Sequence, residues 1–136
     1  MKVHHIGYAV RSLQAAKQKF QLLGFSPFGE EVMDVARNVR IQFMENAGVL
    51  IELITPLKED SPVSQILSKA GNSPYHVCYE VENIPRTAEE LRAQHFLLLS
   101  PPSAAVACGG SRVAFLFHKD IGLIELLETG REECGS

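Results

Sequence analysis

The sequence predicts an α+β fold built from two tandem copies of one strand-helix-strand-strand-strand (βαβββ) module. Two pairs of similar segments indicate the duplication. HIGYAVRSL (5–13) aligns with HVCYEVENI (76–84), and RIQFMENAGVLIELI (40–54) aligns with RVAFLFHKDIGLIELL (112–127). The offset is nearly constant, at 71 for the leading histidines (76 − 5) and 73 for the glutamates of the two LIEL tetrapeptides (125 − 52). Such self-similarity at fixed spacing is typical of a repeated structural unit.

The composition is that of one ordinary globular domain, because 46% of the 136 residues are hydrophobic and 21% are charged. A net charge of -3 without a basic block argues against nucleic acid or a membrane surface as partner. The first residues resemble a strand and not a signal peptide, so we expect a cytoplasmic protein. We expect a single domain (1–136) with module one (1–56), a linker helix (57–73), module two (74–130) and a short tail (131–136).

Module one opens with VHHIGYAV, an apolar-rich run that predicts a strand. Apolar residues then recur at helical spacing from Leu13 to Leu23. Ser12 is suited to cap this helix and Gly24 to end it. The runs EEVMDV, VRIQFME and VLIELI predict the three strands that complete the module.

The linker helix lies in SPVSQILSKAG, with Ser61 as cap, Pro62 in the first turn and Gly71 as its end. Module two opens with the strand YHVCYEV, and Pro85 is expected to begin a helix over RTAEELRAQH. The runs FLLLS, RVAFLFH and LIELLE predict its remaining strands. The Pro-, Gly- and Ser-containing segment 100–112 is either a mobile lid or a simple connection.

Each module places a glutamate, Glu52 or Glu125, inside an apolar strand, where a carboxylate is costly unless it is paired or bound to a cation. Each module also carries a histidine, His5 or His76, on its first strand. Pseudo-twofold packing would bring the four side chains together as a two-nitrogen, two-oxygen set that suits Ni, Co, Fe, Mn or Zn. A strand histidine is often only a core residue and a strand glutamate often faces water. The recurrence of both in both repeats favours a metal site.

At these residues the sequence resembles the vicinal oxygen chelate (glyoxalase/bleomycin resistance/dioxygenase) superfamily, from Val3 to about Glu128. The segments HHIGYAV, IELITPLKEDSPV, SPYHVCYEVENI and VAFLFHKDIGLIELLE look most like short, clostridial-type bacterial glyoxalase I, and they are also similar to methylmalonyl-CoA epimerases. The resemblance implies a curved, cup-like sheet around one divalent metal ion, with Ni²⁺ or Co²⁺ first and Zn²⁺ as the alternative. It implies four metal ligands: His5, Glu52, His76 and Glu125.

The resemblance implies a lactoylglutathione lyase (glyoxalase I)-like enzyme. Such an enzyme isomerises a 2-oxoaldehyde thiol hemithioacetal to a 2-hydroxyacyl thioester by proton abstraction through a metal-bound enediolate. The alternatives are a methylmalonyl-CoA epimerase and a non-catalytic small-molecule-binding member. We expect Glu125 to be the base and Glu52 to be a ligand or second acid/base. The alternative is that both glutamates are permanent ligands and that water or another residue moves the proton.

The thiol carrier stays open, because many glyoxalases have Arg and Asn where this chain has Ala9 and Pro56, so glutathione, another thiol and CoA are all candidates. The resemblance also implies a homodimer, with ligands from one chain or from two. His4 and His118 do not match the repeat, so we expect both to lie outside the site. Residues suited to hold a charged carrier are Arg37, Asn38, Arg40, Lys69 and Arg112.

Overall fold

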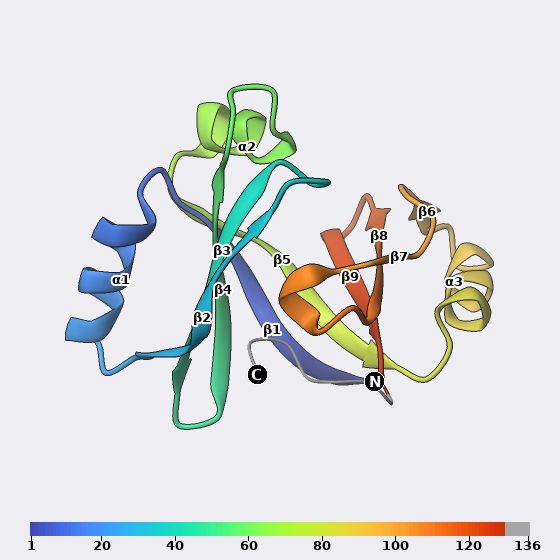
Figure 1. Cartoon of the computed structure of the whole chain (residues 1–136). Coiled ribbons are helices and arrows are strands. Elements are labelled where there is room, and N and C mark those ends of the chain that lie inside the picture. The colour runs from blue at the N-terminus through green and yellow to red at the C-terminus, as the bar shows by residue number, and fades with distance from the viewer. Residues whose placement is uncertain (130–136) are drawn as a thin grey trace.

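We describe residues 1–129 of a computed structural model of the chain (Figure 1), and the tail predicted at 131–136 lies outside the described residues. The first half of the chain forms a strand, a helix and three strands in sequence order. Their bounds are β1 (Lys2–Ala9), α1 (Leu13–Leu22), β2 (Ser26–Asp34), β3 (Val39–Asn46) and β4 (Val49–Pro56).

The second half repeats this order, with one short strand and one 3-10 turn added between its helix and its last hairpin. The elements are α2 (Pro62–Ala70), β5 (Ser73–Val81), α3 (Ile84–Arg92), β6 (Leu97–Leu98), β7 (Ser103–Ala104), η1 (Val106–Cys108), β8 (Arg112–His118) and β9 (Gly122–Glu128). Helix α2 lies within the predicted linker. The module bounds themselves stay a prediction.

All the described strands belong to one curved sheet with the order β2-β3-β4-β1-β5-β9-β8-β6, and β7 pairs with β8 at the edge (Figure 1). The first strands of the two modules, β1 and β5, are antiparallel neighbours at the centre. Each then pairs in parallel with the last strand of its own module, β1 with β4 and β5 with β9. This arrangement confirms the predicted α+β fold of two tandem βαβββ modules in one curved sheet.

The helices begin where the sequence predicts, with one exception. The hydroxyl oxygens of Ser12 and Ser61 accept hydrogen bonds from the first turns of α1 and α2. Helix α3 begins at Ile84, one residue before the predicted Pro85, because the Asn83 side chain caps it. It also ends before the predicted His95, whose φ of 71° belongs to the left-handed region and interrupts a right-handed helix.

The helices α1 and α3 cover the outer flanks of the sheet and leave its concave face for the site (Figure 1). Leu53 of β4 is buried in the cluster that also contains Leu13 of α1, whereas Ile54 belongs to the cluster on the other face. Since side chains alternate along a strand, Glu52 points with Ile54 toward the concave face.

Candidate metal centre

The four predicted metal ligands come from four neighbouring strands at the centre of the sheet. One potential ligand atom from each lies within 4.8 Å of the others. The four side chains are buried, with exposed fractions of 2% for His5, 6% for Glu52, 4% for His76 and 6% for Glu125. One chain therefore brings all four predicted side chains together.

The spacing within the cluster suits a metal ion. His5 Nε2 lies 3.3 Å from Glu52 Oε1 and 3.2 Å from Glu125 Oε1. His76 Nε2 lies 3.6 Å and 3.2 Å from the same two oxygens, and 3.4 Å from His5 Nε2. Ligands that are about 2.0–2.2 Å from a tetrahedral ion lie about 3.3–3.6 Å from one another. The four atoms therefore surround a point that a divalent cation fits.

The hydrogen bonding of the cluster also points to a cation. Glu125 Oε1 is buried and has no hydrogen-bond partner with acceptable geometry, although both imidazole Nε2 atoms are 3.2 Å away. Leaving a buried carboxylate oxygen unpaired is costly. A divalent cation between the two imidazoles and the two carboxylates would supply the missing partner, so the residues present fit such an ion.

Proximity in this cluster shifts the pKa values of its members. Burial alone would raise the pKa of Glu125, but close contacts with His5 and His76 and their charges outweigh it and hold this pKa far below its usual range. Burial alone would lower the pKa of His5, but the charge of Glu52 and contacts with Cys78 and both carboxylates raise it well above its usual value. The cluster therefore favours the ionised form of the Glu125 carboxylate.

The two modules build their halves of the cluster in the same way. Phe43 on β3 is paired in register with Glu52 and packs edge-on against the His5 ring, at 5.3 Å between centroids and 85° between planes. Phe115 on β8 is paired with Glu125 and packs against His76 at 5.3 Å and 86°. The sequence analysis did not single out these phenylalanines, although they are aligned in the RIQF and RVAF segments of the repeat.

The modules differ at the residues that face the two imidazoles across the β1–β5 pair. Gly7 lies opposite His76, and a Cβ atom at Gly7 would overlap the His76 ring. The repeat-equivalent residue, Cys78, lies opposite His5 and is fully buried. Burial, and after it the charge of Glu125, raises the pKa of the Cys78 thiol to about 12. The Cys78 side chain therefore stays a neutral thiol beside His5.

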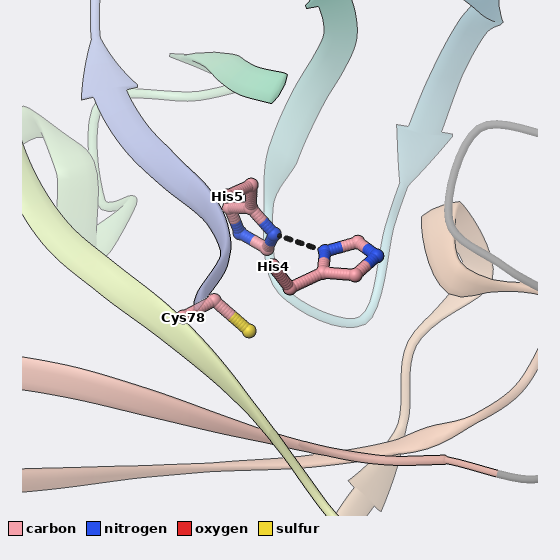
Figure 2. Close-up of side chains that lie close together, drawn as sticks. All are labelled: His4, His5 and Cys78. Carbon is pink, nitrogen blue, oxygen red and sulfur yellow. Dashed lines mark hydrogen bonds between the residues drawn. The ribbon is translucent and has the colours of Figure 1, made fainter. Parts of the chain in front are cut away.

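One residue of the centre was assigned wrongly from the sequence. His4, which we expected to lie outside the site, has its Nδ1 atom 2.8 Å from Nδ1 of His5. Figure 2 shows the hydrogen bond between these two nitrogen atoms, with Cys78 on the neighbouring strand. The other histidine expected outside the site, His118, is bound through its own Nδ1 to the backbone N–H of Asp120.

A cavity of about 760 Å³ opens over the cluster, and Glu52 and Glu125 are among its lining residues. Its wall is mainly apolar, with residues such as Ile41, Ile54 and Phe115. The volume lies within the range of about 300–1,000 Å³ that is usual for small-molecule pockets. The predicted lid segment, 100–112, supplies part of this wall. Its movement stays a prediction.

Tyr75, which the sequence analysis did not single out, also lines this cavity and packs edge-on against His76, at 4.6 Å between ring centroids. Burial raises the pKa of Tyr75 well above its usual value, and the charges of Glu52 and Glu125 add to the effect. Its phenol therefore stays protonated and is available to the pocket as a hydrogen-bond donor. Tyr75 occupies the repeat position of His4, so the two modules use this position differently.

Two of the five residues predicted to hold the substrate, Arg37 and Asn38, line the cavity. The Arg37 guanidinium pairs with buried Asp34 at 3.0 Å and also donates to the backbone of Ala104 and to the Ser103 hydroxyl. These contacts tie the turn after β2 to the segment that borders the cavity in module two. Arg37 therefore has a role within the fold, and substrate contact by Arg37 or Asn38 stays a prediction.

The other three candidates do not border the cavity. Arg40 is 3.5 Å from Glu31 at the surface, Lys69 is exposed in the last turn of α2, and Arg112 donates two hydrogen bonds to Glu128. The carboxylate of Glu128 raises the pKa of the Arg112 guanidinium. The structure gives these three side chains no direct access to the centre, and a role in holding the substrate stays a prediction for them.

The fold and the centre together define a protein of tandem βαβββ modules around a buried pair of histidines and pair of carboxylates. Residues 4–115 match the Glyoxalase/Bleomycin resistance protein/Dioxygenase superfamily, and the chain belongs to it. The resemblance seen in the sequence is thus confirmed at the level of the superfamily.

Several of the similar proteins are named as epimerases. The mitochondrial methylmalonyl-CoA epimerase of Bos taurus is 32% identical over 129 residues, which cover 92% of this chain and 73% of the relative. The ethylmalonyl-CoA/methylmalonyl-CoA epimerase of Cereibacter sphaeroides is 30% identical, with coverage of 92% and 96%. A Streptomyces coelicolor methylmalonyl-CoA epimerase, solved with 2-nitronate-propionyl-CoA, superposes with a TM-score of 0.83 at 25% identity, covering 98% of this chain and 97% of that one. These relatives favour the epimerase alternative over glyoxalase I.

Proposed function

We propose that the protein is an epimerase of the methylmalonyl-CoA type, which inverts the carbon between a carboxylate and a CoA thioester. The observation that carries the proposal is the pair of buried carboxylates, Glu52 and Glu125, which stand at equivalent positions of the two modules and both line the cavity. Epimerisation removes a proton from one face of a carbon and returns one to the other face. Two carboxylates from opposite halves of the site are suited to this task.

In this proposal Glu125 is the first base, because its carboxylate lines the cavity and its buried Oε1 atom has no hydrogen-bond partner among the described residues. Glu52 acts as a ligand or as the acid/base on the other side. His5 and His76 complete the metal-binding set with the two glutamates. A divalent cation held there, Ni²⁺ or Co²⁺ first and Zn²⁺ as the alternative, would acidify the proton alpha to the carbonyl and offset the charge that develops.

The cavity wall supports a thioester substrate with a small alkyl branch. Its apolar residues can contact the alkyl branch. They also lower the local dielectric constant, which strengthens the electrostatic interactions of the two carboxylates. Tyr75 is a neutral donor in this wall, and its ring packs against that of His76. We propose that it hydrogen-bonds a substrate oxygen.

The second candidate is glyoxalase I-like isomerisation of a hemithioacetal. The complete set of two histidines and two glutamates favours it, because these residues fall on the four metal positions of the glyoxalase I resemblance. That reaction also begins with removal of a proton from a carbon next to a carbonyl that a metal ion would activate. It then returns the proton to the neighbouring carbon instead of to the opposite face of the same carbon. The two candidates differ in the substrate that the cavity accepts.

The deciding experiment uses the full chain, stripped of metal and reloaded with Ni²⁺, Co²⁺ or Zn²⁺. One epimer of methylmalonyl-CoA is incubated in D₂O, and both epimerisation and deuterium incorporation at the alpha carbon are followed. The hemithioacetal of methylglyoxal with glutathione is assayed in parallel. We expect epimerisation with deuterium incorporation. Turnover of the hemithioacetal alone would establish the second candidate, and binding without turnover of either would indicate a non-catalytic member of the superfamily.

A homodimer and a cytoplasmic location stay predictions for this protein. Among residues 1–129, the structure shows no helix that is long and apolar enough to cross a membrane.

A further inference from the structure

The two histidines of the proposed metal centre have different partners at the ring nitrogen that points away from the cluster. His76 Nδ1 is buried and has no hydrogen-bond partner. His5 Nδ1 lies 2.8 Å from Nδ1 of His4, which is hydrogen-bond distance (Figure 2). The centre therefore has one imidazole that a neighbouring side chain can orient and one that it cannot.

A β-bulge explains how His4 reaches its neighbour. Successive side chains of a regular strand point to opposite faces, so His4 and His5 of an undisturbed strand would not meet. The register of β1 against β5 shifts between Val3 and His5, which places His4 in a β-bulge. A bulge of this kind changes the direction of a side chain, and bulges are frequent beside functional sites.

The short distance between the two nitrogens constrains the protons of both rings. A hydrogen bond between two Nδ1 atoms needs a proton on one of them and a lone pair on the other. If His5 is to offer the lone pair of Nε2 to a cation, its proton must be on Nδ1. Nδ1 of His4 must then be the acceptor.

We propose that His4 is a positioning residue for the metal centre, which accepts the Nδ1 proton of His5 and so fixes the tautomer and the ring orientation in which His5 Nε2 faces the cation. This inference rests on the proposed function only in that it requires the four-residue cluster to bind a metal. Histidine ligands commonly donate their second nitrogen to an acceptor in this way, and loss of the acceptor typically costs about 10–100-fold in metal affinity.

The same residues do not make a second metal site. Nitrogens of His4 and His5 and the sulfur of Cys78 lie within 4.8 Å of one another. However, the two Nδ1 atoms are 2.8 Å apart, closer than the spacing of about 3.3–3.6 Å between ligands of a tetrahedral ion. His5 also directs its other nitrogen to the central cluster. The geometry is that of a hydrogen bond.

The test compares His4→Ala with His4→Asn in the full chain. Asparagine keeps an acceptor, because its Oδ1 atom is as many bonds from Cα as Nδ1 of histidine. The matched control is His95→Asn, which removes an exposed histidine at a φ of 71° that asparagine tolerates. Affinity for Co²⁺ is measured by competition with a chromophoric chelator, and ¹H–¹⁵N spectra of the Zn²⁺-loaded protein report the Nδ1 proton of His5.

We expect His4→Ala to lower Co²⁺ affinity about 10–100-fold and, through loss of the hydrogen bond, to shift the Nδ1 proton of His5 upfield and speed its exchange with water. His4→Asn should restore most of both properties, and His95→Asn should change neither. Wild-type affinity in His4→Ala, or equal losses in the Ala and Asn variants, would overturn the proposal. A protein that binds Co²⁺ tightly but does not epimerise the CoA thioester would instead refute the proposed function and leave the role of His4 intact.

Discussion

The two modules contribute the same two side chains to the proposed metal centre but surround them differently. In each, a histidine on the first strand meets a glutamate on the last strand, and a phenylalanine packs against the histidine ring. The His5 half adds a histidine partner and a buried thiol. In the His76 half, the ring fills the space that a Cβ atom at Gly7 would need, and its Nδ1 has no hydrogen-bond partner among the described residues. Duplication therefore preserved the ligands, while the neighbours of the two halves diverged.

This difference separates the residues that would bind the cation from the residues that would orient those side chains. Residues shared by both modules define the cluster, so their loss should affect chemistry and metal binding most. Residues found in one module only should affect one half of the centre. Paired substitutions at repeat-equivalent positions test this division directly.

The largest effect is expected at the two glutamates. Glu125→Gln removes the proposed base while keeping the shape of the side chain, and we expect the rate of epimerisation to fall about 10²–10⁴-fold. If Glu52 serves the opposite face, Glu52→Gln should produce a similar fall in epimerisation. Each variant should then still exchange the alpha proton of one epimer with D₂O, observed by NMR. Full turnover by Glu125→Gln would remove Glu125 from the role of base.

The next effect is expected at the residues that face the two imidazoles. Gly7→Ala places a methyl group where the His76 ring lies. Because a displacement of about 1 Å in a catalytic group can cost about 10²-fold in rate, we expect a fall of this order in turnover, together with weaker Co²⁺ binding. Both are measured on purified protein, with the folded state checked by circular dichroism.

The matched variant is Cys78→Ala at the equivalent position of module two, which creates space instead of removing it. We expect a loss of about 1–2 kcal/mol in the free energy of unfolding from the small cavity, with Co²⁺ affinity changed only a few-fold. Suppose that Gly7→Ala retained wild-type Co²⁺ affinity while Cys78→Ala lost it. The close approach of the His76 ring to Gly7 would then not matter for metal binding, and this account of the two positions would be wrong.

The smallest effect is expected at the two phenylalanines. Phe43 is 2% exposed, so Phe43→Leu should lower the free energy of unfolding by about 1–2 kcal/mol through lost packing and the lost ring contact with His5. Phe115 lines the cavity, so Phe115→Leu should destabilise less and raise KM a few-fold instead. Urea denaturation and steady-state kinetics measure the two quantities. An unchanged KM together with a larger loss of stability in Phe115→Leu would contradict this division.

Local sequence signals were sufficient for the fold. The cap residues Ser12 and Ser61 and the repeat itself predicted the elements and their order, because these signals depend on near neighbours. The sequence did not locate the start of α3, where the capping side chain of Asn83 precedes the proline that we took as the beginning. It also predicted FLLLS as a full strand, of which only Leu97–Leu98 is paired.

The ligand cluster was predictable because each of its four members repeats at a constant offset. His4 was not, because strand alternation places it away from His5, and only the bulge brings the two rings together. Arg37 was predicted from its charge alone, and its contacts with Asp34, Ser103 and Ala104 depend on the way the two modules pack. Long-range packing has no local signature in a single sequence.

The most direct test of the account is a Co²⁺ titration of the metal-free protein, followed by visible absorption, in the wild type, in a His5→Ala/His76→Ala double variant and in His95→Asn. The central claim is that the duplicated histidine and glutamate pairs hold one divalent cation. It predicts one tightly bound Co²⁺ per chain in the wild type and in His95→Asn, and loss of this binding in the double variant. Absence of binding in the wild type, or stoichiometric binding that survives the double substitution, would contradict the claim.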